Sequence, residues 1–283
     1  MAKVVDGRAI AREIRSQVKE RAKLFEEKEG RRPVLKVLMV GENEASMVYV
    51  RSILRTASKL NIEASLVQLP EDVDQGRVLS LMEELNRNDQ VDGIMVQMPL
   101  PRHLDSEAIV SAMDPSKDVE GVHPMNYGRL VLKKEDLVPC TPMAVVRILE
   151  HEGFPLRGAE AVIVNRTPVV GKPLSLLLLH RDATVTVTHT KTRDLKFHTR
   201  RADLVVVAVG RPRLFTKDYF REGVAVVDVG INEVDGKIVG DVDFEGVSEI
   251  ASLITPVPGG VGPVTTAILM ENVLKAAEGR LRA

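Results

Sequence analysis

The sequence predicts an α/β protein of two domains, the second of them built on a doubly wound parallel sheet. With 283 residues the chain is long enough to bury two separate cores. Strand-like apolar runs and helix-like amphipathic runs alternate in two blocks, separated by an irregular stretch. In the second block, residues 161–171 combine a short apolar strand, a tight loop and the start of a helix. Such a strand–loop–helix unit is typical of nucleotide-binding α/β domains.

The first block is expected to begin with a helix that ends near Gly30. Asp6 is a good N-cap for it, and Ile10, Ile14 and Val18 recur at helical spacing. Strands and helices should then alternate over 33–40, 45–60, 62–69, 73–88 and 91–97. A short helix is expected over 105–113, and frequent turn residues predict an irregular segment over 114–140.

The second block is expected to open with a helix over 141–152. Its strands are predicted over 161–164, 184–188, 203–209 and 224–229. Asp235 and Gly236 predict a small hairpin over 231–241. The proline- and glycine-rich stretch 254–263 predicts a rigid loop, and 264–277 should form the closing helix.

The composition is that of an ordinary globular protein, with 44% apolar and 28% charged residues. A net charge of −1 provides no long-range attraction to nucleic acid or to an anionic membrane. The single cysteine excludes an internal disulfide framework, and no apolar run approaches the ~20 residues of a membrane span. The six histidines show no metal-ligand spacing, so no metal is expected. We therefore expect a cytoplasmic protein whose partners are neither nucleic acid nor membrane.

The loop that follows the strand at 161–164 is a candidate phosphate site. Backbone N–H groups and the positive end of a helix dipole would point into it. A dinucleotide fingerprint would place several glycines here, whereas only Gly171 is glycine, and Asn165 and Thr167 occupy positions where glycine would fit best. A plain buried strand–helix turn therefore explains the loop about as well as a nucleotide site does.

The end of the next strand favours NADP over NAD as the nucleotide. Proteins that bind NAD usually carry Asp or Glu there, hydrogen-bonded to the ribose hydroxyls. This chain instead has His189, Thr190 and Lys191, with Arg166 in the preceding loop and no acidic residue. A basic pocket with hydroxyl groups suits the extra phosphate of NADP. The alternative is that Arg166 and Lys191 are solvated surface charges.

Five motifs resemble, in order and spacing, those of the methylenetetrahydrofolate dehydrogenase/cyclohydrolase family. They are QMPLP at 97–101, KDVEG at 117–121, PCTP at 139–142, DVGIN at 228–232 and PGGVGP at 258–263. The resemblance covers nearly the whole chain. It implies two α/β domains flanking a cleft: a folate-binding domain over 1–140 and 265–283, and a Rossmann-type NAD(P)-binding domain over 141–264. It also implies a homodimer that oxidises 5,10-methylenetetrahydrofolate with NADP in one-carbon metabolism.

The resemblance also assigns residues to the site. Tyr49 matches a tyrosine that stacks on the p-aminobenzoate part of folate, and Gln97 matches a glutamine of the active-site hydrogen-bond network. The implied substrate-binding residues are Tyr49, Gln97, Asp118, Glu120, Pro258 and Gly262, of which Tyr49, Gln97 and Glu120 are also catalytic. The implied cofactor-binding residues are Thr141, Asn165, Arg166, Thr167, Thr190, Ile231 and Thr265.

Some of these residues also have a purely structural interpretation. Tyr49 could pack on a neighbouring element, and Gln97 could cap the end of its strand. Asp228 of the DVGIN motif could be a turn former rather than a site residue. Cys140 is not expected to be a nucleophile, because no His–Asp partner pattern accompanies it.

The chain departs from the family at the catalytic lysine, which lies four residues after the tyrosine. Ile53 occupies that position here. Arg51 and Arg55 should not replace the lysine, because they lie about 200° and 240° around the helix from Tyr49. Glu120 stands where the family usually has aspartate, which lengthens the side chain by about one methylene.

The missing lysine should affect one activity more than the other. Hydride transfer needs the substrate held in position, whereas hydrolysis of the methenyl cation needs acid–base help. We therefore predict a dehydrogenase with weak or absent cyclohydrolase activity. One alternative is a fully bifunctional enzyme that yields 10-formyltetrahydrofolate. Others are a non-catalytic family member that binds folate or nucleotide, and a generic NADP reductase for another substrate.

Overall fold

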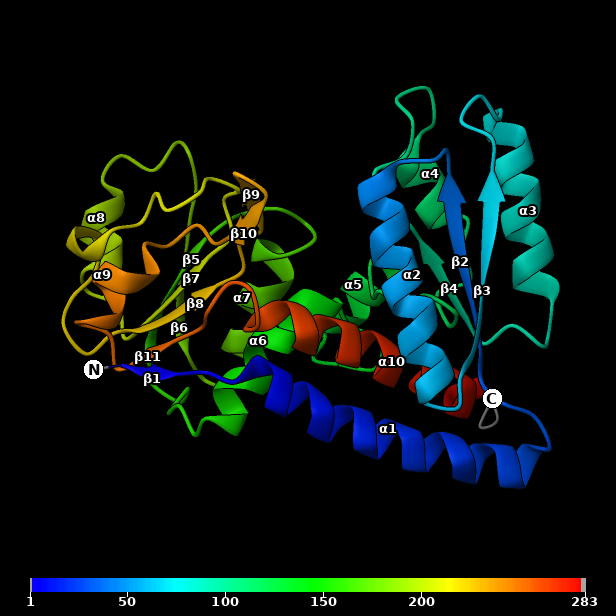
Figure 1. Ribbon diagram of the computed structural model, residues 1–283, viewed down its shortest axis with the longest axis horizontal. Helices are drawn as coiled ribbons and strands as arrows, with labels where there is room; N and C mark the ends of the chain where they lie inside the picture. The colour runs from blue at the N-terminus through cyan, green and yellow to red at the C-terminus, as the bar shows by residue number, and fades with distance from the viewer. Residues whose placement is uncertain (1, 281–283) are drawn as a thin grey trace. The chain divides into compact units, whose positions relative to one another are not determined.

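The structure is a computed structural model that describes residues 2–280, and it divides into two compact units (Figure 1). Unit 1 contains the residues up to Arg12 together with Pro139–Ile268. Unit 2 contains Glu13–Val138 together with the residues from Leu269 on. The long helices α1 (Gly7–Glu29) and α10 (Val261–Arg280) therefore each contribute to both units.

The structure assigns the residues up to Arg12 to unit 1, whereas the sequence placed them in one domain with 13–140. The reason is strand β1 (Lys3–Val4), which pairs in parallel with β11 (Leu253–Ile254) of unit 1. Helix α1 then starts directly after this strand, with the side chain of Asp6 accepting the backbone N–H of Ala9 at 2.9 Å. The N-cap expected at Asp6 is confirmed.

Unit 1 is built on a six-stranded sheet in which every neighbouring pair is parallel, in the order β1-β11-β8-β7-β5-β6. The central strands are β5 (Glu160–Val164), β6 (Thr184–Thr188), β7 (Leu204–Val207) and β8 (Ala225–Asp228). The chain runs outward from β5 to β6 and then returns past β5 to β7. This reversal creates a topological switch point between β5 and β7, where ligands of doubly wound sheets bind.

Helices cover both faces of this sheet, as a parallel sheet requires. The helical elements within unit 1 are α6 (Cys140–His151), α7 (Gly171–Leu179), α8 (Leu195–Thr199), the 3₁₀ helix η1 (Lys217–Tyr219) and α9 (Phe244–Ser248). Helix α7 packs on β5 and β6 and against α6. Leu195, Tyr219 and Phe244 from the shorter helices pack against the core of the opposite face.

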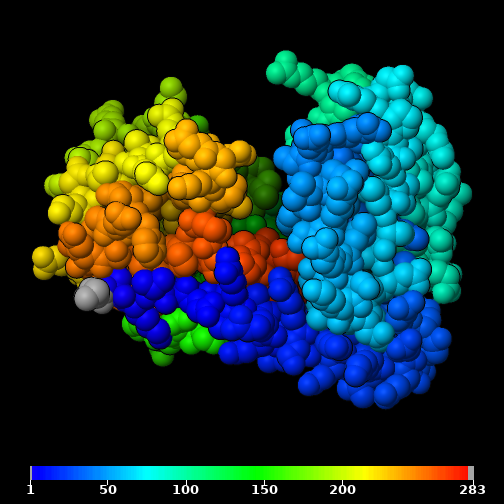
Figure 2. Space-filling model, in the orientation of Figure 1, coloured from blue at the N-terminus to red at the C-terminus, as the bar shows by residue number. Residues whose placement is uncertain are grey.

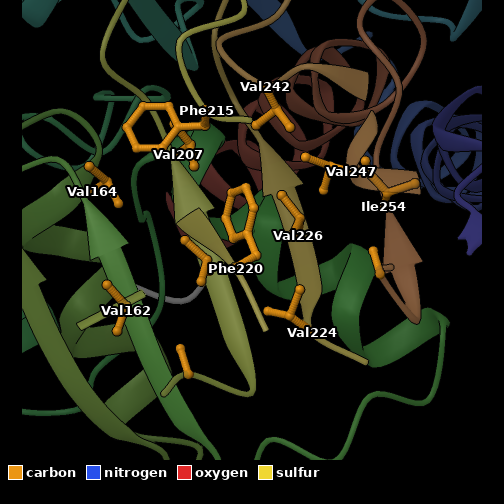
Figure 3. Close-up of a cluster of buried hydrophobic side chains, with 13 residues drawn as sticks. Val162, Val164, Val207, Phe215, Phe220, Val224, Val226, Val242, Val247 and Ile254 are labelled. Carbon is orange, nitrogen blue, oxygen red and sulfur yellow. The ribbon is translucent and has the colours of Figure 1, made fainter. Parts of the chain in front are cut away.

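That core is made of valines from the strands and two phenylalanines from the segment after β7 (Figure 3). Phe215 and Phe220 are 1% and 5% exposed and pack over the strand valines. Alternate residues of β5, β7 and β8 point into this cluster, namely Val162, Val164, Val205, Val207 and Val226. β-Branched side chains on a pleated surface make this packing close and rigid.

Unit 2 is built on a three-stranded parallel sheet in the order β3-β2-β4. Its strands are β2 (Val34–Val40), β3 (Glu63–Leu69) and β4 (Gly93–Val96), and its helices include α2 (Glu44–Lys59), α3 (Gln75–Arg87) and α4 (Ser106–Ser111). Apolar residues of α3 and α4 pack with those of β2 and β4 in one core. Figure 1 shows α2 and α3 on either side of this small sheet.

Two expectations from the sequence need correction or refinement. The segment 114–140 is not wholly irregular, because it contains helix α5 (Pro124–Val131). His123 caps this helix and Pro124 occupies its first turn, so residues that signal a turn in fact start a helix. The closing helix begins at Val261 rather than at 264, while the hairpin β9 (Asn232–Val234) and β10 (Lys237–Val239) forms as expected. Among the described residues, no helix is long and apolar enough to cross a membrane.

Candidate active site

The carboxyl ends of the parallel strands of unit 1 gather most of the residues expected to bind a cofactor. Asn165, Arg166 and Thr167 follow β5, Thr190 follows β6, and Ile231 follows β8. Because all these strands run in the same direction, the loops after them lie along one edge of the sheet. Thr141 and Thr265 belong to the same unit but lie on helices α6 and α10.

The loop between β5 and α7 is held together by the side chain of Asn165. Its Oδ1 accepts the backbone N–H groups of Thr167 at 2.7 Å and of Gly171 at 2.9 Å, and the Thr167 hydroxyl at 2.8 Å. Its Nδ2 donates to the backbone carbonyl of Ala208, just after β7. Asn165 thus ties the two strands together at the switch point. Asn165, which stands where the dinucleotide fingerprint would favour glycine, therefore organises the loop.

Gly171 is required by the same loop. A Cβ atom at this position would lie 2.1 Å from the backbone oxygen of Asn165, well inside contact distance. The one glycine kept from the fingerprint therefore allows the start of α7 to pack against the end of β5. The loop keeps a compact turn at a helix N-terminus, which is the geometry that accepts a phosphate.

Arg166 is the residue of this loop that remains available to a ligand. Its side chain is exposed and makes no hydrogen bond or ion pair with any residue that the structure describes. Thr190, in the turn after β6, is also exposed. That turn is fixed by its own contacts, since His189 N–H donates to the hydroxyl of Thr192 at 2.9 Å. A cation on one loop and a hydroxyl on the next suit an added phosphate.

The loop after β7 also forms a nest of backbone N–H groups, but a carboxylate of the chain fills it. Asp241, which is fully buried, accepts the N–H groups of Val209, Gly210 and Arg211 at 2.6 to 3.0 Å. This nest is closed to an external anion. Of the two loops at the switch point, the one after β5 is thus the candidate for the cofactor phosphates.

Asp228 has a structural role in this structure rather than a binding one. Its carboxylate accepts the backbone N–H groups of Gly230, Asp241 and Val242. Burial raises the pKa of this carboxyl to about 6, although the three N–H donors act in the opposite direction and the Asp241 carboxylate adds to the rise. The turn-forming interpretation of Asp228 therefore fits the contacts.

The proline- and glycine-rich loop lies between β11 and α10. Pro258 is exposed and follows a cis peptide bond, and Gly260 N–H donates to the carbonyl of Pro256 at 2.9 Å. Gly262 is exposed in the first turn of α10, and nothing lies within 4 Å of the place where its Cβ would be. Open space beside a fixed backbone is what a planar ligand needs for close approach.

Tyr49 and Ile53 lie about 40° apart around helix α2 but differ in exposure. Ile53 is fully buried in line with Val50 and Ala57, whereas Tyr49 is 38% exposed. The outer face of α2 forms part of the visible surface of unit 2 (blue in Figure 2). Arg51 and Arg55 are exposed, as the helical geometry predicts.

The residues after β4 form a polar cluster at the carboxyl end of the small sheet. Gln97 directly follows β4 and is only 8% exposed, and its Nε2 donates to the carbonyl of Met98. Asp118 lies beside β4 through a parallel bridge to Ile94 and is fully buried. Glu120 follows two residues later, and its carboxylate accepts the backbone N–H of Val96. The two motifs QMPLP and KDVEG thus meet at one point.

Two buried oxygen atoms of this polar cluster have no hydrogen-bond partner among the described residues. They are Oε1 of Gln97 and Oδ1 of Asp118. The other oxygen of Asp118 accepts the backbone N–H of His123 at 2.7 Å and Nδ2 of Asn126 at 2.8 Å. Buried polar atoms are almost always paired in folded proteins, so these two mark a place for a polar ligand.

The electrostatics of the cluster are those of a site without a counter-charge. Desolvation, and then repulsion from Asp118, raises the pKa of the Glu120 carboxyl to about 8. The same two causes raise the pKa of Tyr127 to about 12. Neither Asp118 nor Glu120 forms a salt bridge with any described lysine or arginine. Glu120 is therefore a carboxyl group that can hold or release a proton near neutral pH.

Sequence reasoning missed the residues that hold this cluster in place. The ammonium of Lys117, a residue that is 1% exposed, donates to the carbonyls of Leu85, Asn86 and Asn88 at the end of α3. Asn272 of α10 donates to the carbonyls of Val119 and Val138. A signal for Lys117 existed in the KDVEG motif, whereas Asn272 had none, because its partners lie far away in the sequence. Among the described residues, no group of His, Cys, Asp or Glu could hold a metal ion.

Together these features define a class of protein. A doubly wound domain with a compact phosphate-type loop at its switch point is a dinucleotide-binding domain, and a second unit with unpaired buried polar atoms contains a candidate substrate site. Comparison with known families agrees. Residues 5–120 match the catalytic domain, and residues 139–281 the NAD(P)-binding domain, of the tetrahydrofolate dehydrogenase/cyclohydrolase family. The chain belongs to this family.

Individual relatives match over the full length. The bifunctional protein FolD of Azoarcus sp. (strain BH72) is 48% identical over 287 residues, covering 100% of this chain and 98% of that protein. The crystal structure of the bifunctional FolD enzyme from Campylobacter jejuni has a TM-score of 0.96 at 44% identity, covering 99% and 100% of the two chains. The enzyme from Trypanosoma brucei, solved with NADP and an inhibitor, has a TM-score of 0.94 at 37% identity and covers 100% and 99%.

Proposed function

We propose that this protein oxidises 5,10-methylenetetrahydrofolate to 5,10-methenyltetrahydrofolate by hydride transfer to NADP, within one-carbon metabolism. The observation that carries the proposal is the polar cluster of unit 2, in which Gln97 and Asp118 keep buried oxygen atoms unpaired beside Glu120. A pterin offers ring N–H groups and an exocyclic amine, which such oxygen atoms accept. Family membership over both domains supports the same substrate.

Each group of residues has a proposed task in this reaction. Tyr49, exposed on α2, would stack on the p-aminobenzoate part of folate, and Gln97, Asp118 and Glu120 would bind its pterin part. Pro258 and Gly262, which are both exposed, remain proposed substrate-binding residues. When bound, the nicotinamide cofactor supplies the hydride acceptor. The task of the chain is to fix donor and acceptor in one orientation, which needs no protein base.

NADP is proposed as the cofactor because the residues present fit its charges. The β5–α7 loop has the geometry for the pyrophosphate, and exposed Arg166 and Thr190 would hold the added phosphate. Asn165 and Thr167 would act by fixing the shape of the loop, since the Asn165 side chain accepts the backbone N–H and the hydroxyl of Thr167. Thr141, Ile231 and Thr265 remain proposed contacts of the cofactor. The Trypanosoma brucei relative was solved with NADP.

The second candidate function is the cyclohydrolase. The relatives are named bifunctional, which favours the alternative of a full dehydrogenase/cyclohydrolase over the weak or absent hydrolysis predicted from Ile53. Ile53 itself supplies no acid–base group and is fully buried. Any hydrolysis must therefore rely on other groups of unit 2.

One two-step assay tests the proposed function. Purified protein is given 5,10-methylenetetrahydrofolate with NADP or NAD, and reduction of the cofactor is followed. Methenyltetrahydrofolate is then supplied directly, and its disappearance is compared with a buffer blank. Reduction of NADP supports the dehydrogenase, and hydrolysis clearly above the blank supports the bifunctional alternative. Ligand-induced thermal stabilisation without any reduction would instead indicate a non-catalytic binding protein.

Two further proposals concern the setting of the enzyme. We propose a homodimer and a cytoplasmic location, as the family resemblance and the composition suggest. Sedimentation at several protein concentrations tests the first, and fractionation of cells tests the second.

A further inference from the structure

The polar cluster of unit 2 contains the carboxyl group of Glu120, whose features are not explained by the task of holding a substrate in position. Glu120 is partly exposed, while Asp118, two residues earlier, is fully buried. The Glu120 carboxylate accepts one N–H, from Val96, and Gln97 follows directly in the chain. Glu120 therefore lies next to the two unpaired oxygen atoms of Gln97 and Asp118, at the place where a polar ligand is expected.

The charges around Glu120 favour exchange of a proton. The titratable group that acts on it is Asp118, which repels its negative charge. Tyr127 lies beside Asp118, and His123 contacts Asp118 through its backbone N–H. The ammonium of Lys117 is bound to carbonyls at the end of α3. With a pKa of about 8, the Glu120 carboxyl changes its protonation in the range where the enzyme would work.

We infer that Glu120 is the proton-transfer residue for hydrolysis of the methenyl cation in this chain, in place of a lysine at position 53. This inference rests on the proposed folate chemistry. It reconciles two observations: the relatives are named bifunctional, and Ile53 provides no acid–base group. The positive charge of the methenyl substrate would favour the carboxylate form of Glu120 on binding, which is the form that can act as a base.

The step balances with water as the only co-reactant. The oxygen of a water molecule bonds to the bridging carbon of the methenyl cation, and one water proton passes to the Glu120 carboxylate. The tetrahedral adduct then loses its hydroxyl proton to solvent and forms the formyl C=O bond. The bond between the carbon and N5 breaks, its electron pair stays on N5, and N5 takes the proton from the Glu120 carboxyl. One water is consumed, one proton is released and the carboxylate is restored.

The test compares Glu120→Gln and Glu120→Asp with the unmodified protein. Glu107→Gln, an exposed glutamate of α4, is the matched control. Methenyltetrahydrofolate hydrolysis and NADP reduction are measured separately from pH 6.5 to 9 over a range of substrate concentrations, so that both kcat and kcat/KM are obtained, with the blank subtracted at each pH. Glu120→Gln should lower kcat for hydrolysis about 100-fold or more, since acid–base groups contribute roughly 10²–10⁴-fold. Hydride transfer should also slow, because Glu120 helps to bind the pterin, but by a smaller factor than hydrolysis, since hydride transfer needs no protein acid or base.

The pH profile gives a second readout that a merely structural role would not move. For the unmodified protein, kcat/KM for hydrolysis should rise with pH through about 8, as Glu120 loses its proton. Glu120→Gln should abolish this rise, and Glu120→Asp should keep it at a reduced rate. If Glu120→Gln has a lowered melting temperature, the pH profile of Glu120→Asp tests the role of Glu120 instead.

Three results would overturn the inference: hydrolysis no faster than the blank in the unmodified protein, hydrolysis unchanged in Glu120→Gln, or an equal loss of both activities in it. Failure of the proposed function itself looks different. In that case the unmodified protein reduces no NADP with methylenetetrahydrofolate, whatever Glu120 does to methenyl hydrolysis.

Discussion

At the scale of single residues, the residue with the sharpest consequence is Ile53. The helical spacing placed position 53 near Tyr49, and both residues lie on α2, but the side chain of Ile53 points into the core. The structure therefore shows that a lysine at position 53 would lower the stability of the fold, which the helical spacing alone did not indicate. A lysine at this position would have to extend its stem along α2 to bring the ammonium to the surface.

Ile53→Lys should raise methenyltetrahydrofolate hydrolysis and lower the melting temperature. The gain is expected because the family resemblance implies an acid–base lysine at this position, and the loss because a buried isoleucine is replaced by a charged side chain. Hydrolysis assays and thermal melts check the two effects. Ile53→Met is the matched control, which keeps the volume and should change hydrolysis little. A lysine variant that folds without any gain would show that the site differs in more than this residue.

Arg166→Ala should weaken the use of NADP without affecting the use of NAD. Arg166 is exposed and unpaired among the described residues, so the lost interaction is with the added phosphate. A charge-assisted hydrogen bond of about 1.5–3 kcal/mol corresponds to a rise in KM for NADP of roughly 10–100-fold. Steady-state kinetics with both cofactors measure this. Arg157→Ala, a highly exposed arginine of the same unit, serves as the control. Equal changes for NADP and NAD would contradict the assignment.

At the scale of elements, the β5–α7 loop shows what the sequence could and could not predict. The strand, the turn and the helix were predictable from local patterns, and the two strands beside the loop lie where the apolar runs placed them. The role of Asn165 was not predictable, because its partner Ala208 is distant in the chain and comes close only through the order of the sheet. Helix α5 was missed for a different reason: its capping residues resemble a turn.

Gly171→Ala should disrupt the candidate cofactor loop. A Cβ would overlap the backbone oxygen of Asn165 at 2.1 Å, so the start of α7 must move away from β5. We expect a lower melting temperature and loss of the thermal stabilisation that NADP gives. Gly128→Ala in α5 is the control, because its Cβ would meet no atom within 4 Å and alanine favours a helix. Undiminished stabilisation by NADP in Gly171→Ala would place the phosphates elsewhere.

The turn after β8 should give unit 1 a specific pH dependence. Desolvation raises the pKa of Asp228 to about 6, whereas an unfolded chain has the ordinary value of about 3.9. The folded state thus binds the proton more tightly, and the contribution to stability is fully present below about pH 4. It is lost as the pH rises through about 6, by roughly 3 kcal/mol in total.

Asp228→Asn removes this titration and tests its sign. Urea unfolding of both proteins at pH 4.5 and pH 7 gives the free energies of unfolding. The advantage of the unmodified protein over Asp228→Asn should be larger at pH 4.5 than at pH 7. Part of the difference should be independent of pH, because the amide cannot accept all three N–H groups that the carboxylate accepts. A difference that does not vary with pH would refute the titration.

At the scale of the whole molecule, each unit is completed by a segment from a distant part of the chain. Lys3–Val4 adds a strand to the sheet of unit 1, and the part of α10 from Leu269 on belongs to unit 2. Alternation of strands and helices predicted the two blocks, since it depends on local sequence. It could not predict that the start of the chain would belong to unit 1, because that depends on the pairing of residues 3–4 with residues 253–254.

Asn272→Leu should affect both stability and the substrate site of unit 2. Asn272 is fully buried, and its amide donates to the carbonyls of Val119, between Asp118 and Glu120, and of Val138. Leaving those carbonyls unsatisfied should cost about 1–3 kcal/mol, which urea unfolding can measure. KM for methylenetetrahydrofolate should rise, while the Kd for NADP should stay the same. A variant with lowered stability and unchanged KM would limit Asn272 to a role in folding.

Lys117 offers a way to observe motion in the substrate unit. Its ammonium is bound to three carbonyls at the end of α3 and is almost completely hidden from solvent. Reagents that acylate amines can therefore reach it only when the segment that carries Asp118 and Glu120 separates from α3. The rate at which Lys117 is labelled therefore measures how often this segment opens. Folate that binds the closed segment should lower the labelling rate of Lys117, while the labelling rate of exposed lysines stays the same.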